Sequence, residues 1–334
     1  MFLLKKLKII SFILAALLIA SFAVRNYNIR HNRMEERKRF MMDTFVMIKA
    51  AGPSKKAIKA IEDALDRMQE IDVKMNPMNP ASPLYAFNEK GTTIDDPEIV
   101  LLVQKGLEIS KLSGGAFDMT LLPLTKLWGF SGKAPHLPAD RDIQDALAKT
   151  GYKYLVVKDG KVKKLRPYIQ IDFGGIAKGY AVGEAVKILK REGITSAMID
   201  AGGDIFAVGK SGGKKLWKIG VKSPRDEGIV GYVELTEKSI ACSGDYERYF
   251  IKDGKRYHHI FNAKTGYPAD GGLLSASIIY HDCTMTDVWT KVLFVLGPEK
   301  GMELVKKNPG MEAIMVTKDN KVLYFGTENM LKKI

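Results

Sequence analysis

The run from Ile171 to Tyr180, IDFGGIAKGY, contains the residue types of an anion-binding turn. We expect a strand that ends near Asp172, a turn at Gly174-Gly175, and a helix directly after it. The N–H groups and the dipole at a helix N-terminus attract anions. Lys178 would lie in the first helical turn, where a cation is unfavourable for the dipole unless it contacts a phosphate. The run lacks the Gly-Lys-Ser/Thr ending of a P-loop, so nothing supports nucleoside triphosphate hydrolysis.

Two adjacent histidines, His258 and His259, lie in the run from Tyr257 to Pro268. Successive side chains on a strand point to opposite faces, so the pair is not expected to share one metal ion. One of them could face a cleft and act as a base near neutral pH. A pair that simply faces solvent explains these residues equally well.

Asp287 opens a predicted helix in the run from Thr286 to Lys291, TDVWTK. An Asp at this position commonly caps a helix N-terminus. It could equally supply one oxygen to Mg²⁺, which takes few protein carboxylates and obtains its other ligands from phosphate and water. Both interpretations remain open at the level of the sequence.

Two further runs place glycines beside polar groups. The first is GGAFDMT, from Gly114 to Thr120, in which Asp118 lies beside aromatic surface and glycines allow close approach of the backbone to a ligand. By itself, a helix C-cap followed by core aromatics is the better explanation. The second is DAGGDI, from Asp200 to Ile205, for which a simple tight turn is an equally good explanation.

The elements that must position these residues follow from apolar periodicity and from turn residues. We predict helices over 54–75, from the N-cap Asp96 to Gly114-Gly115, over 141–149, 176–191 and 287–296. We predict strands over 154–157, 161–165, 168–173, 197–200, 217–221, 231–235, 249–251, 274–280, 313–317 and 322–325. The order lacks regular βαβ alternation. We therefore expect an α+β fold: a mixed, mostly antiparallel sheet with flanking helices.

The N-terminal residues resemble an export signal. Lys5, Lys6 and Lys8 precede a predominantly apolar run, Ile9 to Val24, of 16 residues, which is shorter than the roughly 20 of a full membrane span. We expect residues 1–24 to be a signal or membrane anchor, with an uncleaved anchor favoured. Residues 25–39 would be a polar linker and residues 40–334 the main domain. That domain would lie at the inner (cytoplasmic) membrane, on its extracytoplasmic, periplasmic side.

Composition excludes several classes of function. The net charge is +14, but nine Lys and Arg residues and only two acidic ones fall within residues 1–39, and the rest are dispersed. Nucleic-acid binding needs a concentrated basic stripe, which is absent from the sequence. The two cysteines, Cys242 and Cys283, lack metal-ligand spacing, and unpaired thiols are the simpler expectation.

Several motifs in one order across roughly residues 40–300 resemble the ApbE family of flavin transferases. The matching pieces are Met42-Asp43-Thr44-Phe45, Asn88, GGAFDMTLLPL with LWGF, IDFGGIAKGYAVGEA, AGGDI, SGDYERYF, HHIFNAKTGYP, and the Asp287 helix that ends in FVLG.

The resemblance implies a reaction and a partner. The family cleaves the pyrophosphate of FAD with Mg²⁺, attaches FMN through a phosphoester to a Thr or Ser of a target flavoprotein, and releases AMP. The acceptor would be a subunit of a membrane redox complex or another exported flavoprotein.

The resemblance also implies roles for residues. Met41 or Met42 and Ala116, Phe117 and Asp118 would border the flavin. Asp172, Lys178 and Ile260 would contact FAD. His259 would be a base or a flavin or phosphate contact. The carbonyl of Gly175 and the carboxylate of Asp287 would bind Mg²⁺.

One departure from the family pattern concerns the metal. Lys291 stands where the family has a metal-ligand Thr, with Thr290 adjacent. Thr290 could supply an oxygen instead, or the Lys291 ammonium could neutralise part of the charge. Two alternatives to the transferase follow: an exported FAD-binding protein without transfer, and an FAD pyrophosphatase that gives FMN and AMP.

Overall fold

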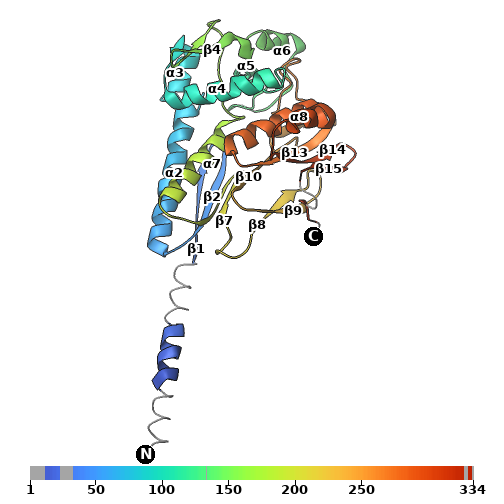
Figure 1. Cartoon of the computed structure of the whole chain (residues 1–334). Helices are drawn as coiled ribbons and strands as arrows, with labels where there is room; N and C mark the ends of the chain where they lie inside the picture. Colours follow the sequence, from blue (N-terminus) through green and yellow to red (C-terminus); the bar gives the residue numbers. More distant parts are fainter. Residues whose placement is uncertain (1–11, 23–32, 133, 327–329, 333–334) are drawn as a thin grey trace, which may run out of the picture.

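The computed structural model describes residues 12–22, 33–132, 134–326 and 330–332. Within them, an antiparallel sheet of eight strands forms the centre of the molecule (Figure 1). Its order is β1-β2-β6-β7-β10-β13-β14-β15, and every neighbouring pair is antiparallel. The strands are β1 (Met34–Met41), β2 (Thr44–Ala51), β6 (Ser196–Ala201), β7 (Asp204–Gly209), β10 (Lys238–Gly244), β13 (Leu273–Tyr280), β14 (Glu312–Thr317) and β15 (Val322–Phe325). The predicted α+β fold with a mostly antiparallel sheet is confirmed.

Three helices cover one face of this sheet: α2 (Ser54–Met75), α7 (Ala177–Arg191) and α8 (Cys283–Val305). The hairpin of β8 (Trp217–Lys222) and β9 (Ile229–Leu235) packs on the other face. Neighbouring residues of β13 point to opposite faces, as the period of a strand requires. Ile278 thus belongs to the main core under the helices, and Ile279 to the smaller core under the hairpin.

A third group of elements gathers at one end of the molecule, at the top of Figure 1. It contains α3 (Pro83–Glu89), β3 (Thr93–Ile94), α4 (Pro97–Leu112), α5 (Leu122–Leu127), α6 (Asp140–Leu147), a 3₁₀ turn (Tyr152–Tyr154), β4 (Leu155–Lys158) and β5 (Lys161–Lys164). Trp128 is fully buried there and packs on Tyr257 and Phe261, near the hairpin of β11 (Tyr249–Lys252) and β12 (Lys255–His258).

Most predicted elements are confirmed, but the predicted strand over 168–173 is wrong. Hydrogen bonds to other parts of the chain hold this irregular segment. Asn88 Nδ2 donates to the carbonyl of Ile171 at 2.8 Å, the N–H of Ile171 donates to Asn88 Oδ1 at 2.7 Å, and the N–H of Asp172 donates to the carbonyl of Met119 at 2.7 Å. The buried amide of one side chain therefore takes the place of a partner strand, and hydrophobicity alone cannot reveal such a partner.

The N-terminal boundary also differs from the expectation. Residues 34–39, which we assigned to a linker, form most of β1 and pair with β2. Residues 12–22 are helical and exposed, and none of the described helices is both long and apolar enough to span a membrane. The remainder of the predicted leader (1–11 and 23–24) and residues 25–32 of the predicted linker lie outside the described residues. Cys242 and Cys283 are free thiols.

The helices α7 and α8 cross at a very short distance because α7 carries Gly179 at the crossing. A Cβ at this position would lie 2.3 Å from the carbonyl oxygen of Cys283 and 2.7 Å from Cβ of Asp287. The N–H of Gly179 instead donates to Asp287 Oδ2 at 3.0 Å. Because Gly179 has no side chain, two helices that lie more than a hundred residues apart in the sequence can approach closely and form this hydrogen bond.

We expect Gly179→Ala to lower the free energy of unfolding by about 1–3 kcal/mol, because the methyl group forces the helices apart. Urea denaturation measures the change. Gly183→Ala on the same helix is the matched control, since its Cβ would lie 3.9 Å from Cβ of Cys283, an ordinary contact. There the better helix propensity of Ala should raise stability by roughly 0.5–1 kcal/mol. Equal effects at both positions would contradict the close crossing.

Candidate active site

Four charged side chains meet where α7, α8 and β7 come together, and we call them the four-charge cluster: Lys178, Asp204, Asp287 and Lys291. Asp287 is 0% exposed and Asp204 is 2% exposed. The ammonium of Lys178 pairs with Asp204 Oδ2, and the ammonium of Lys291 pairs with Asp287 Oδ1. The cluster therefore combines two buried carboxylates with two ammonium groups that each keep limited contact with solvent.

The environment keeps this cluster ionised. Burial raises the pKa of Asp204 to about 6, with a further contribution from repulsion by Asp287. Burial opposes ionisation of Asp287 as well, but Lys291 and Lys178 outweigh it and hold the pKa of this carboxyl below its usual range. The two carboxylates likewise hold the pKa of Lys178 above its ordinary value in spite of burial. Two ammonium groups are thus held, each beside its carboxylate, in a site of low dielectric, where electrostatic interactions are strong.

The predicted glycine turn lies beside the cluster. Asp172 Oδ1 accepts from the N–H of Gly174 at 2.8 Å, and burial raises the pKa of Asp172. A Cβ on Gly175 would lie 3.1 Å from the ring of Phe117 and 4.0 Å from Cε of Lys291. The structure therefore brings Gly175, Phe117 and Lys291 together.

Asp118, which the resemblance places at the border of the flavin, is bonded to its own loop and to Tyr152. Its Oδ1 accepts from the N–H of Thr120 at 2.8 Å and from the Thr120 hydroxyl at 2.6 Å. Its Oδ2 accepts from the N–H of Tyr152 at 2.9 Å. Both oxygens thus stabilise the loop that carries the buried Ala116 and Phe117.

The two histidines have separate environments, as predicted. His258 is buried, and its Nε2 lies 3.1 Å from the carbonyl oxygen of Ala269. His259 is partly buried, and its Nδ1 lies 3.2 Å from the carbonyl oxygen of Arg248. Because a carbonyl only accepts, Nδ1 of His259 carries the proton and Nε2 keeps a lone pair. Burial and the guanidinium of Arg248, with a smaller effect of Lys291, lower the pKa of His259 to about 3.

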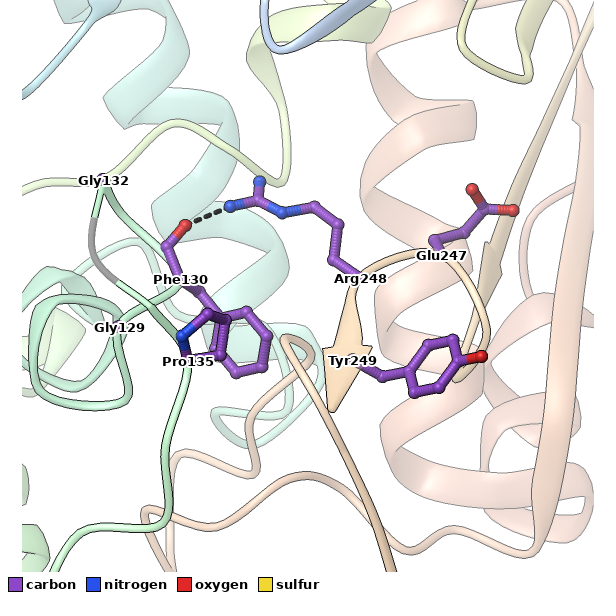
Figure 2. Close-up of a pocket in the computed structure, with 7 residues that line it drawn as sticks. All are labelled: Gly129, Phe130, Gly132, Pro135, Glu247, Arg248 and Tyr249. Atoms are coloured by element: carbon purple, nitrogen blue, oxygen red, sulfur yellow. Dashed lines mark hydrogen bonds between the residues drawn. The ribbon is translucent and has the colours of Figure 1, made fainter. Parts of the chain in front are cut away.

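A hollow of about 310 Å³ lies between the loop at Phe130 and the segment from Glu247 to Tyr249 (Figure 2). The ring of His259 packs edge-on against the ring of Phe130, which lines the hollow. Arg248 extends across it and donates to the carbonyl of Phe130, as Figure 2 shows. The hollow is at the lower end of the range for small-molecule pockets. Its lining residues are Gly129, Phe130, Gly132, Pro135, Glu247, Arg248 and Tyr249.

The turn between β1 and β2 reaches the same region. Met41 is buried at the end of β1, and the N–H of Met42 donates to Asp72 Oδ2 at 3.0 Å. Asp43 Oδ2 lies 3.8 Å from Nη1 of Arg248. Asp43 of this turn thus approaches Arg248, which lines the hollow. The predicted Met41 and Ile260 are both buried in the main core, and Met42 packs against it.

Sequence reasoning gave no role to two charged residues of this site. Asp204 follows the glycine pair in DAGGDI, where a simple turn was an equal alternative. Arg248 lies in SGDYERYF. The available signal was the presence of charged residues close to glycines in both motifs, but it does not identify which carboxylate is buried or which cation faces a neighbouring loop.

Asp287 is not an N-cap. Asp282 caps α8 instead, and its Oδ1 accepts from the N–H of Met285 at 3.1 Å. The cap hypothesis was wrong because α8 begins at Cys283, about one turn before the predicted start. Asp287 therefore lies inside the helix, with its side chain directed at α7.

The residues around Asp287 do not fit a magnesium ion. Mg²⁺ requires oxygen ligands in near-octahedral geometry, but the ammonium of Lys291 lies on Asp287 Oδ1. The hydroxyl of Thr290 is already bonded, at 2.7 Å, to Ser243 Oγ and to the carbonyl of Asp287. Asp204 Oδ1 is buried without a hydrogen-bond partner, but one such oxygen does not make a site. Among the described residues no group of three His, Cys, Asp or Glu side chains is placed to hold a metal.

Comparison with known proteins agrees with the motifs. The model of the ApbE family matches residues 42–315. The FAD:protein FMN transferase of Klebsiella pneumoniae is 33% identical over 245 residues, which are 72% of this chain and 75% of that protein. The FAD:protein FMN transferase of Treponema pallidum is 29% identical over 83% of this chain and 82% of its own length.

Solved structures give the same result. The ApbE protein of Thermotoga maritima superposes with a TM-score of 0.84 at 32% identity, covering 90% of this chain and all of that one. The flavin transferase ApbE of Vibrio cholerae superposes with a TM-score of 0.78 at 27% identity, over 89% of this chain and 99% of that one. The sequence motifs, the fold and these matches together show that the chain belongs to the ApbE family.

Proposed function

We propose that this protein is an FAD:protein FMN transferase that moves the FMN half of FAD to a Thr or Ser hydroxyl of an acceptor flavoprotein and releases AMP. The observation that best supports this function is the four-charge cluster, which lies next to the glycine turn and near the neutral ring of His259. In the proposed reaction the acceptor oxygen bonds to the FMN phosphorus. The bond from that phosphorus to the bridging oxygen breaks, and the bridging oxygen leaves with AMP.

Charge neutralisation is the main demand of this reaction, because negative charge develops on the leaving phosphate. Lys178 and Lys291 each have three N–H donors, and the carboxylates Asp204 and Asp287 use only part of them. The remaining donors can bind diphosphate oxygens. The aspartates fix the positions of the ammonium groups before the substrate arrives, which is the property that makes such groups effective in catalysis.

His259 is the proposed acceptor of the hydroxyl proton. Its ring is neutral at pH 7, and Nε2 has a lone pair. An imidazole with so low a pKa is a weak base on its own. A bound diphosphate adds negative charge nearby, which raises the pKa of His259 towards its usual range and makes proton transfer more favourable.

The resemblance also implied Mg²⁺ as a cofactor. Since Lys291 occupies the carboxylate that would bind the ion, no step of the proposed reaction passes through a metal.

We further propose that the N-terminal residues place the domain at the extracytoplasmic side of the inner membrane, where exported flavoproteins or subunits of membrane redox complexes are the acceptors. The support is the basic and then apolar sequence of residues 1–24. We expect protease added to spheroplasts to digest the domain, and a cytoplasmic protein in the same cells to be protected. Protection of both would contradict this location.

We expect incubation of the full-length chain with FAD and an acceptor flavoprotein to add the mass of one FMN phosphoester to the acceptor. Intact-mass spectrometry measures the gain, and an acceptor whose Thr or Ser is replaced by Val or Ala is the control. FMN and AMP in solution without a mass gain would identify a pyrophosphatase. Bound FAD without either product would identify a flavin-binding protein.

The same assay tests the cluster. We expect the double variant Lys178→Met, Asp204→Asn to lose at least about 100-fold in transfer rate, because one stabilising cation is removed. Changing both residues leaves no unpaired buried charge, so the fold should persist, as circular dichroism can verify. A transfer rate within a few-fold of wild type would contradict the role of Lys178.

His259 should also make stability depend on pH. Unfolding restores the ordinary pKa near 6.5, so the unfolded chain takes up the proton first. Stability that is present above pH 6.5 is therefore lost as the pH falls from about 6.5 towards 3. Between pH 7 and pH 5 we expect His259→Gln to remove roughly 1–2 kcal/mol of this loss, measured by urea denaturation at both pH values. An identical pH slope in the variant and in wild type would contradict the low pKa.

A further inference from the structure

We propose that Lys291 supplies, from within the chain, the positive charge that a divalent cation would supply at this position, so that FMN transfer by this protein needs no divalent metal. The inference rests on the proposed function for the reaction, but its statement about metal binding is independent of it.

The position of Lys291 is the first support. The resemblance assigns the cation to two groups, the backbone of Gly175 and the carboxylate of Asp287. Lys291 is close to both residues: its ammonium contacts Asp287 Oδ1, and its Cε lies 4.0 Å from where a Cβ of Gly175 would be. The side chain is 16% exposed, so the ammonium is held in a defined place and still reaches the site.

The charge balance is the second support. Without a ligand, the four-charge cluster has two negative and two positive charges and is neutral. A divalent cation on Asp287 would add two positive charges in direct contact with an ammonium in a buried region, where repulsion is poorly screened. The ion could bind only if the Lys291 side chain moved away, and this movement would break the ion pair between Lys291 and Asp287.

The neighbouring hydroxyl is the third support. Thr290 could have compensated for the substitution by offering its oxygen to an ion. It is fully buried, and its hydroxyl is bonded to Ser243 and to the carbonyl of Asp287. One turn after Asp287, α8 therefore offers the ammonium of Lys291 and no free side-chain oxygen, because the hydroxyl of Thr290 is already bonded.

The geometry suggests a substitution that would let the site bind a divalent cation in place of the Lys291 ammonium. Positions 287 and 291 are four residues apart on α8 and face the same side. In Lys291→Thr a hydroxyl oxygen would replace the ammonium beside Asp287, and the charge that repels a metal would be gone. Lys291→Met is the matched control, because it removes the charge without adding an oxygen.

The experiment compares the full-length wild type with Lys291→Thr and Lys291→Met. Mn²⁺ is the metal probe, and the signal of free Mn²⁺ in electron paramagnetic resonance measures binding without any reference to activity. We expect Lys291→Thr to bind Mn²⁺ at least tenfold more tightly than wild type. We expect wild-type transfer to change less than twofold with EDTA, and transfer by Lys291→Thr to disappear with EDTA and to return with Mg²⁺. Lys291→Met should stay inactive under both conditions.

Wild-type binding of Mn²⁺ as tight as that of Lys291→Thr would overturn the proposal. So would loss of wild-type transfer with EDTA that Mg²⁺ restores, and these wild-type measurements do not require any variant to fold. Absence of transfer under all conditions would refute the proposed function, while the Mn²⁺ titration would still decide whether Lys291 excludes the metal.

Discussion

The pairing of two buried carboxylates with two lysines is the interaction on which the arrangement of this site depends. A carboxylate as buried as Asp287 or Asp204 is strongly unfavourable unless a cation and hydrogen-bond donors accompany it. Lys291, Lys178 and the N–H of Gly179 provide them from two helices. The cluster therefore fixes α7, α8 and the start of β7 relative to one another, although these segments are distant in the sequence.

The other elements of the fold hold the four-charge cluster and the residues around it in place. The central sheet packs against α7 and α8. The loop that Asp118 stabilises places Phe117 against the glycine turn. On the other side, Arg248 connects the segment before β11 to the loop at Phe130 and fixes the ring of His259 through its carbonyl. Residues from several motifs thus lie in one region, where ion pairs and hydrogen bonds hold them in place.

Local signals in the sequence were sufficient for much of the fold. The apolar spacing of residues 54–75 predicted α2 with its observed bounds, and Asp96 caps α4 through two N–H groups as expected. Non-local partners explain the failures. The partner of the segment at Ile171 is a side chain, Asn88, and β1 is an edge strand whose alternating charged residues resemble a linker.

The site was predictable as a set of residues but not as a set of contacts. The motifs singled out Lys178 and Asp287, and the resemblance singled out His259. The structure places Lys178 and Asp287 in one cluster, and Lys291 of that cluster is close enough to His259 to lower its pKa. The pairing of Lys291 with Asp287 follows from their spacing of four residues on one helix. Sequence alone could not show that Thr290 is bonded to Ser243 of β10, or that Lys178 and Asp204 join the cluster, because these contacts depend on how α7, α8 and the sheet pack together.

A crystal structure of the full-length protein with FAD, grown in the presence of Mn²⁺, tests the central claim most directly. The account predicts that diphosphate oxygens lie within hydrogen-bond distance, about 2.7–3.2 Å, of the ammonium groups of Lys178 and Lys291, with no anomalous signal of manganese on Asp287. A manganese ion bound to Asp287 with Lys291 displaced, or a diphosphate remote from both lysines, would contradict it.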